Sequence, residues 1–338
     1  MTGGWWWDAL GLAIVAFAVV DEVRTTLAVA SGPGPLTRLV TGAVWRLARR
    51  PAVADAAAVR AVGGPGVILV GLTVGAWFSL LWLGWSLVFL GDGRAVVGSS
   101  TGAPASLWER FYFAGYSIAT LGNGGYQPDG AGSQLATMAA ALSGMLLITL
   151  GVSYLTSVIS AVVVKRSFAA EVTGFGQTGA DMAAGLTTPG SVVPAVVPLS
   201  SLSSTLSTLG QQHRAYPLLH AYRPRDADLG TAPAVAVLLD ATLALSAAAD
   251  PADRLPAGLR RSVVSAVQQY VEHAPVTGGE EAGPAPGLDP GAIGRAGLRV
   301  DTGQLAALTA ECAGLRDELC RRIEAAGYRW PGGERSPS

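Results

Sequence analysis

Long apolar runs separated by polar segments organise the first half of the chain. The runs are Trp5–Leu27, Gly66–Leu90 and Gln134–Val164, and the last one ends at Lys165 and Arg166. A helix needs about 20 consecutive apolar residues to cross a hydrocarbon core of about 30 Å, and each run meets that length. The pattern therefore predicts an all-α membrane protein with three transmembrane helices.

The first run carries charges that the second run lacks. Its N-terminal end has three tryptophans and no basic residue, which is typical of a retained span rather than a signal peptide. Asp21 and Glu22 lie near its other end, with Arg24 within helical reach of Asp21. We expect these acidic residues at the membrane interface.

Basic residues between the first two runs set the expected orientation. Short cytoplasmic loops carry an excess of Lys and Arg, so this loop is expected on the cytoplasmic side of the membrane. The protein is expected to be a multi-pass protein of the plasma membrane. The N-terminus is then outside and the C-terminus cytoplasmic. Apolar positions at helical spacing predict that Pro35–Arg50 is an interfacial amphipathic helix, or alternatively a solvated surface helix. The basic residues of this loop are Arg38, Arg46, Arg49, Arg50 and Arg60.

The composition changes after Arg166 to shorter periodic segments rich in Ala, Ser, Pro and Gly. We expect residues 1–62 to form an N-terminal region, residues 63–166 the membrane core, and residues 167–338 a soluble cytosolic helical domain. Thr231–Ala249 is apolar but carries Asp240 at its middle, which favours a buried core helix over a fourth span.

Two further segments of the second half have distinct patterns. The Pro/Gly-rich residues 275–297 predict a disordered linker. Apolar residues at three-four spacing over Asp301–Ala326 predict one helix, whose stripe is either a coiled-coil seam or part of a domain core.

Composition and charge exclude several classes of function. The 338 residues are 50% hydrophobic with a formal net charge of −1, so the chain lacks the basic excess that nucleic-acid binding requires. Its two cysteines, Cys312 and Cys320, provide neither a disulfide framework nor the spacing of a metal site. GFGQTG at Gly174–Gly179 fits a nucleotide-binding pattern, but no strand precedes it and no βαβ alternation follows.

The histidines offer no catalytic constellation. His213, His220 and His273 lack carboxylate or cysteine partners at ligand spacing, and we expect them to be surface or cap residues. No nucleophile, base and orienting group can be assembled from the second half. The sequence therefore predicts neither an enzyme nor a bound cofactor or metal.

A short apolar helix and a glycine-rich stretch lie between the second and third runs. Ser106–Ala119 is too short to span, and ATLGNGGYQP (Ala119–Pro128) follows it directly. Irregular backbone at membrane depth is tolerated only where protein buries it or where it lines a water-filled path. We therefore expect these carbonyls to face ions, although GNG alone also fits an ordinary turn.

The order of outer helix, short re-entrant helix, glycine stretch and inner helix resembles the pore module of the potassium channel family. Thr120, Leu121, Gly122, Asn123 and Gly124 stand where that family has TVGYG. The resemblance implies a filter whose backbone carbonyls, supplied by four chains, replace the hydration shell of K⁺. It therefore implies a homotetramer in a lipid bilayer, with the permeant cation as the only ligand of the pore.

Two positions depart from the family pattern. Asn123 replaces the filter tyrosine and Gly125 replaces the usual aspartate at the outer rim. Three readings therefore stay open: a potassium channel, a weakly selective monovalent cation channel, and a non-conducting membrane signalling or scaffold protein that keeps the pore fold. The ligand or protein partner of the cytosolic domain also stays open.

The third apolar run carries polar and glycine positions of interest. A polar stripe at helical spacing is expected to line a wet cavity, unless its hydroxyls bond back to carbonyls one turn earlier. Gly144 lies where the family has its hinge glycine and Gly151 is a second candidate, although either glycine also permits close helix packing. The stripe consists of Thr149, Ser153, Thr156 and Ser160.

Overall fold

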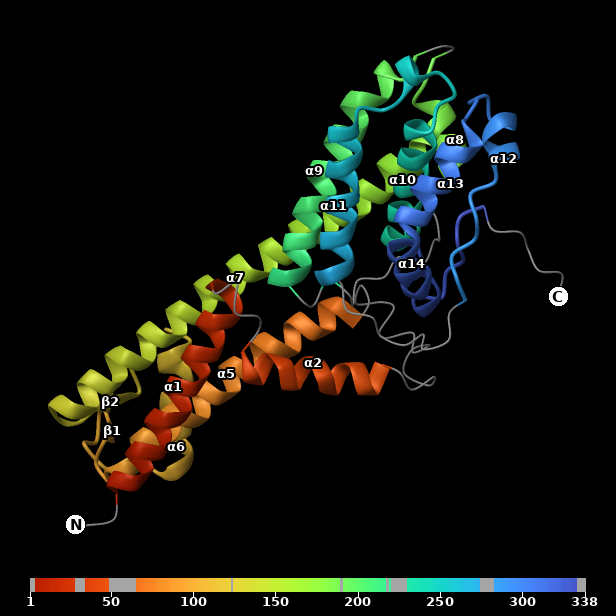
Figure 1. Cartoon of the computed structure of the whole chain (residues 1–338). Coiled ribbons are helices and arrows are strands. Elements are labelled where there is room, and N and C mark those ends of the chain that lie inside the picture. The colour runs from red at the N-terminus through yellow and green to blue at the C-terminus, as the bar shows by residue number, and fades with distance from the viewer. Residues whose placement is uncertain are drawn as a thin grey trace. The chain divides into compact units, whose positions relative to one another are not determined.

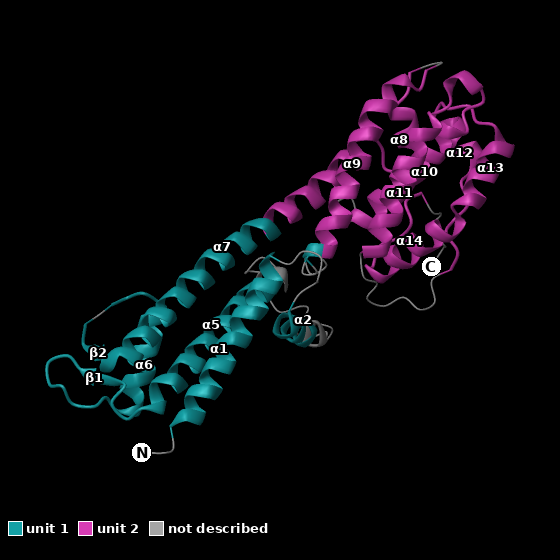
Figure 2. Ribbon diagram, turned by 60° about the vertical axis from the view of Figure 1, so that its left-hand side comes forward, with its two compact units in different colours: residues 1–158, 215–221 teal, residues 159–214, 222–338 magenta. Residues whose placement is uncertain are grey.

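The computed structural model is mostly helical, as expected for an all-α membrane protein, and divides into two compact units (Figures 1 and 2). Unit 1 comprises Met1–Val158 and Ala215–Ala221, and unit 2 comprises Ile159–Arg214 and Tyr222–Ser338. The structure describes residues 4–27, 34–48, 65–122, 124–188, 191–216, 219, 230–273 and 283–332.

Unit 1 is a helical assembly with one small two-stranded sheet. Helix α1 packs along α5, and glycines at positions 11 and 84 let their backbones approach closely. The two strands pair antiparallel with Val97 opposite Gln127. The elements are α1 (Trp5–Leu27), α2 (Pro35–Ala48), α5 (Pro65–Gly91), β1 (Val96–Gly98), α6 (Leu107–Ile118), β2 (Tyr126–Pro128) and the first part of α7 (Gly130–Phe175).

Two helices of the described chain are long and apolar enough to cross a membrane. They are Ile68–Gly91, within α5, and the whole of α7. These correspond to the second and third expected spans. Helix α1, which carries charged residues near both ends, is not among them, so the N-terminal span stays a prediction.

Asp21 lies in the interior of unit 1, and its place at the membrane interface stays a prediction. It is fully buried, and its carboxylate accepts hydrogen bonds from the backbone N–H of Leu36 (2.8 Å), the hydroxyl of Thr37 (2.9 Å) and Nε1 of Trp77 (2.9 Å). Asp21 thus caps α2 and joins it to α1 and α5, and the expected pairing with Arg24 is wrong. The free amides of a helix N-terminus and an indole N–H compensate the buried charge better than an exposed arginine does.

Helix α7 is longer than the apolar run that predicted it. It extends unbroken for 46 residues, or roughly 70 Å at 1.5 Å per residue, and does not end at Lys165. The last turns bury Phe168, Ala169 and Val172 in the core of unit 2. Because apolar residues follow the basic pair at helical spacing, the helix continues past the expected boundary at residue 166, and the two units divide after Val158.

Unit 2 packs around α10 (Thr231–Ser246). This helix contacts α8, α11, α13 and α14, and nearly all of its residues are buried, so the expected core helix is confirmed. The other elements are α8 (Gly179–Gly185), α9 (Val193–Ala215), η3 (Pro251–Asp253), α11 (Ala257–His273), α12 (Pro290–Arg295), α13 (Thr302–Glu311) and α14 (Ala313–Ala325).

Two expectations for the end of the chain are wrong. The single helix over Asp301–Ala326 is divided at Cys312, whose φ of −100° and ψ of 9° leave the helical region, and its apolar residues join the domain core. The expected disordered linker is ordered from residue 283 onward, where Asp289 caps α12 through Gly291 and Ala292. Residues 275–282 lie outside the described part of the chain.

His213 is a core residue and not a surface one. It is 3% exposed, its Nδ1 lies 2.8 Å from the carbonyl oxygen of Leu209, and its ring packs edge-on against Tyr270. His273 is partly buried at the end of α11, and His220 lies outside the described residues. The expectation was wrong for His213 because its apolar neighbours come from α11, far away in the sequence.

Candidate ion-conduction site

Helix α6 is fixed at its start and along its flank. Ser106 and Glu109 form a capping box, which satisfies free amides of the first turn. Arg110 extends to the end of α5 and donates to the carbonyl of Asp92 at 3.0 Å, and it also contacts Gly93. Nε1 of Trp82 donates to the carbonyl of Phe111 at 2.8 Å. The helix that precedes the glycine stretch is therefore held in one orientation by α5.

The C-terminal end of α6 closes in a Schellman motif. The N–H of Leu121 donates to the carbonyl of Tyr116 at 2.9 Å, and the N–H of Thr120 donates to the carbonyl of Ser117 at 3.1 Å. Thr120 occupies the left-handed position of the motif with φ +55°, where glycine is usual. It is the one non-glycine residue with positive φ in the described chain, and this conformation costs about 1–2 kcal/mol.

The glycine stretch has positive φ at three of its four described residues. Thr120, Gly122 and Gly124 have φ values of +55°, +55° and +70°, while Leu121 between them keeps a negative φ. Asn123 lies outside the described residues. A backbone that alternates in this way turns successive carbonyls to the same side, and glycine permits it where other residues are strained. These φ values are compatible with a carbonyl-lined filter, a role that stays a prediction for this stretch.

Strand pairing holds the chain that leaves the stretch. Strand β2 pairs with β1, the N–H of Ser99 donates to the carbonyl of Gly125 at 3.1 Å, and the N–H of Asp129 donates to that of Ala95 at 3.0 Å. Arg94 and Asp129 form an exposed ion pair at 3.3 Å. The glycine stretch is therefore held at one end by α6 and at the other by the paired strand β2.

A hollow of about 330 Å³ lies beside the stretch in unit 1. Thr120, Gly122 and Gly124 line one part of it, and α7 contributes Thr137 and Ala141. Leu121 is 72% exposed, so the segment also presents side chains outward from this single chain. The remaining lining residues are Phe113, Tyr116, Ser117, Tyr126, Gln127 and Pro128.

The polar stripe of α7 lies on an exposed face of the helix. The hydroxyls of Thr149, Ser153 and Thr156 each donate to the carbonyl four residues earlier at 2.9 Å. Ser160, one turn further on, is also exposed. The back-bonding alternative therefore describes these hydroxyls in the single chain, and their cavity-lining role stays a prediction.

The two glycines of α7 differ in their surroundings. A Cβ at Gly144 would overlap the carbonyl oxygen of Ile118, at the end of α6. A Cβ at Gly151 would meet side-chain carbons of Val74 at 3.9 Å, which is ordinary contact. Helix α7 is continuous through both positions. Gly144 thus permits a close approach of α6 to α7, and a hinge role for either glycine stays a prediction.

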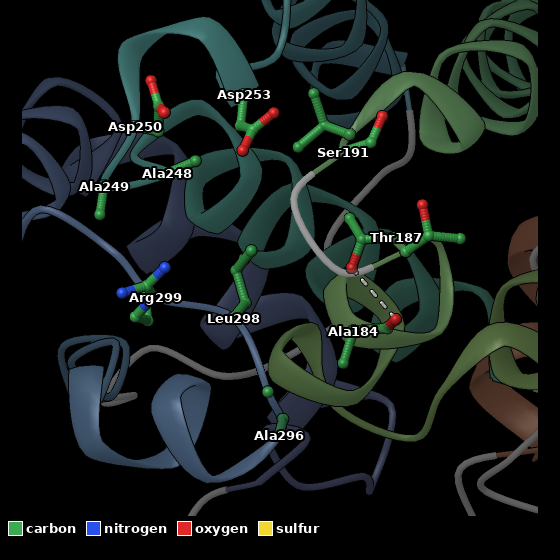
Figure 3. Close-up of a pocket in the computed structure, with 13 residues that line it drawn as sticks. Ala184, Thr187, Ser191, Ala248, Ala249, Asp250, Asp253, Ala296, Leu298 and Arg299 are labelled. Atoms are coloured by element: carbon green, nitrogen blue, oxygen red, sulfur yellow. Dashed lines mark hydrogen bonds between the residues drawn. The ribbon is translucent and has the colours of Figure 1, made fainter.

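Unit 2 contains a separate hollow of about 300 Å³, shown in Figure 3. Three segments distant in sequence surround it, with Thr187 and Ser191 from the first, Asp250 and Asp253 from the second, and Arg299 from the third. The charged side chains at its rim are of both signs, so their chemistry favours no single class of ligand.

Comparison with known proteins agrees with this geometry. Residues 67–161, which include α6, the glycine stretch and most of α7, match a family model described as an ion channel (Ion_trans_2). The chain is 33% identical over 326 residues to the uncharacterized membrane protein YdjJ of Bacillus subtilis (strain 168), covering 95% of this chain and 94% of the relative. No solved structure matches the chain. The chain therefore belongs to the same family of membrane proteins as YdjJ, and its residues 67–161 match an ion channel module.

Proposed function

We propose that the protein is a potassium-conducting channel whose filter is the backbone of Thr120–Gly124. The observation that supports this proposal most directly is the positive φ of Thr120, Gly122 and Gly124, with a negative φ at Leu121. Oxygens on one side of such a segment replace the water shell of a dehydrated cation when several copies surround it. The α6 C-terminus, which carries partial negative charge, adds to the attraction for a cation.

We further propose that four copies assemble around one axis. One chain supplies a single filter strand, and its hollow beside Thr120, Gly122 and Gly124 is open to a neighbouring copy. The outward apolar residues of α7 provide a surface for the bilayer and for other copies. Mass measurement in detergent is expected to give four chains, and a monomer as the sole species would contradict the assembly.

A weakly selective monovalent cation channel is the second candidate. Asn123 cannot supply the aromatic packing that tyrosine provides in the potassium channel family, and Gly125 removes a rim charge. Purified protein in liposomes, tested first with a K⁺ gradient and then with a Na⁺ gradient, distinguishes the two candidates. Flux of neither cation supports instead a signalling or scaffold role that keeps the fold without conduction.

Substitution of a filter glycine tests whether the backbone carbonyls coordinate the permeant ion. No atom lies within 4 Å of a Cβ built at Gly122, so Gly122→Ala introduces only the strain of a left-handed alanine, about 1–2 kcal/mol per chain. Since four chains carry this strain at one ring, we expect K⁺ flux to be lost while the tetramer persists.

Gly102 provides a matched control for this substitution. It has φ +62°, no atom within 4 Å of an added Cβ, and a place in the loop before α6. Gly102→Ala carries the same backbone strain outside the filter and is expected to leave flux unchanged. Normal conduction by Gly122→Ala would show that these carbonyls do not coordinate the ion.

A further inference from the structure

Tyr126, two residues after the filter, is held in place by its side chain. The hydroxyl of Tyr126 donates to Oε1 of Glu109 at 2.8 Å. The other carboxylate oxygen of Glu109 accepts from the N–H of Ser106 at 2.6 Å, within the capping box. Both oxygens are therefore engaged, and the carboxylate that receives Tyr126 is fixed to the first turn of α6.

The same residue is also held by its backbone. The hydroxyl of Tyr116 donates to the carbonyl of Tyr126 at 2.9 Å. Tyr116 is 6% exposed, and its ring packs edge-on against Phe113, with ring centroids 5.2 Å apart. Tyr112 packs against the rings of Tyr116 at 5.3 Å and Tyr126 at 6.4 Å. A buried, packed ring loses little further freedom on making this bond, so the carbonyl of Tyr126 is held in place.

Tyr116 contacts the chain on both sides of the filter. Its own carbonyl accepts the N–H of Leu121, the second residue of the filter, and its hydroxyl donates to the carbonyl of Tyr126, two residues after the filter. One buried residue, through its backbone carbonyl and its hydroxyl, therefore links the chain near the two ends of the glycine stretch. A Cβ built at Gly122 or Gly124 would meet no atom within 4 Å, so no neighbouring side chain packs closely against these two glycines.

We propose that Tyr116, Tyr126 and Glu109 are positioning residues that set the diameter of the filter and its preference for K⁺ over Na⁺. This inference rests on the proposed channel function. The hydrogen bonds take over the restraint that an aromatic side chain at position 123 would otherwise provide. None of the three side chains coordinates the ion, because each acts on the backbone that does.

Tyrosine-to-phenylalanine variants test the inference with little change in packing. Tyr116→Phe and Tyr126→Phe remove one hydroxyl each and keep the rings. We expect each to lower the K⁺/Na⁺ permeability ratio in liposomes by about fivefold, the factor that corresponds to one lost hydrogen bond of about 1 kcal/mol, while K⁺ flux and the tetramer persist. A merely structural role would lower thermal stability and leave the ratio unchanged.

Two further variants separate the role of Glu109 in positioning from its role in capping. Glu109→Gln retains an oxygen that accepts from Tyr126 and is expected to keep the K⁺/Na⁺ permeability ratio. Glu109→Ala removes this oxygen and is expected to lower the ratio. Ser106→Ala removes the cap of α6 without touching Tyr126, so it is expected to lower stability and leave the ratio unchanged.

The outcomes keep this inference distinct from the channel function. A wild-type protein that conducts neither cation contradicts the channel function itself, before any variant is made. A wild-type protein that conducts K⁺ and Na⁺ equally, or one whose ratio is unchanged in both phenylalanine variants, overturns the positioning role and leaves conduction standing.

Discussion

Helices α7 and α10 are both apolar, yet the unit 1 portion of α7 exposes its large side chains whereas α10 is buried. Along its unit 1 portion, α7 exposes large side chains, with Leu142 63% and Val152 60% accessible. In α10 every residue except Ala232 is buried by other helices of unit 2. Apolar side chains that remain outward in a folded chain need lipid or another chain to cover them, whereas those of α10 are already covered.

The carboxylate at the middle of α10 needs partners from other elements of unit 2. Asp240 is bonded to Arg316 of α14 through Nε at 2.9 Å and Nη2 at 3.3 Å, and Nε1 of Trp330 lies 3.3 Å from it. A carboxylate is stable away from water only when it is paired and hydrogen-bonded in this way. Within α7 of unit 1 there is no charged residue to compensate. The contrast lies in the paired charge and not in mean hydropathy.

Breaking the buried Asp240–Arg316 pair should have the largest effect on stability, and this effect should be confined to unit 2. Arg316→Ala leaves Asp240 buried without its cation, and we expect a loss of about 3–5 kcal/mol in the stability of unit 2. Hydrogen exchange measured on the full chain in detergent would show faster exchange in α10 and α14, with α5 and α6 unchanged.

An ion pair whose carboxylate is exposed provides the control for this prediction. Arg260 bonds to Glu311 at 3.1 Å, and the glutamate side chain is 63% exposed. Arg260→Ala is expected to change stability by no more than about 1 kcal/mol, because exposed pairs contribute little. Equal exchange rates in the two variants would mean that the buried pair does not stabilise unit 2.

His213 provides the next largest effect and makes unit 2 sensitive to acid. Burial, aided by the positive charges of Lys165 and Arg322, lowers the pKa of His213 to about 4. An unfolded histidine takes up a proton near pH 6.5, so the unfolded chain binds more protons below that pH. The stability of unit 2 is therefore complete above about pH 6.5 and decreases as the pH falls towards 4, by roughly 3 kcal/mol in all.

The measurement is the pH dependence of unfolding of unit 2 in the full chain. His213→Asn, which keeps a donor for the Leu209 carbonyl, should flatten the loss between pH 6.5 and 4, although it lowers stability at neutral pH. His273→Asn, at the partly buried end of α11, removes only the smallest of the effects that lower the pKa of His213 and should keep most of the wild-type slope. A wild-type slope in His213→Asn would assign the acid sensitivity to another group.

The sequence predicts the local features of this fold better than the long-range ones. The apolar runs of α5 and α7 and the break between them depend on neighbouring residues, and they could be recognised from periodicity alone. The length of α10 and the charge of Asp240 likewise identified it as a core helix. Arg316 could not be identified as its partner, because the pair joins residues 76 positions apart. The bonding partners of Asp21 and the burial of His213 were missed for the same reason.

The candidate site divides in the same way. The glycine stretch is recognisable from its residues, and the motif Ser106-x-x-Glu109 could have been read as a capping box. Glu109, Tyr112 and Tyr116 are spaced three and four residues apart, which places them on one face of α6. Tyr126 joins this face only through the β1–β2 pairing, a contact that periodicity does not reveal. That is why the hydroxyl contacts of Tyr116 and Tyr126 emerge only from the structure.

The smallest expected effect concerns Gly144, where α7 packs closely against the end of α6. A Cβ at position 144 would meet the Ile118 carbonyl, which cannot move without displacing the Schellman motif and Thr120 beyond it. Gly144→Ala should therefore cost about 1–3 kcal/mol through overpacking and lower K⁺ flux through the filter. Gly151→Ala meets only Val74 at ordinary distance and should be tolerated. If instead both glycines act as hinges, each alanine should slow opening to a similar extent and leave selectivity unchanged. Flux measured in liposomes for the two variants side by side decides between packing and hinge, since packing predicts a loss at Gly144 alone.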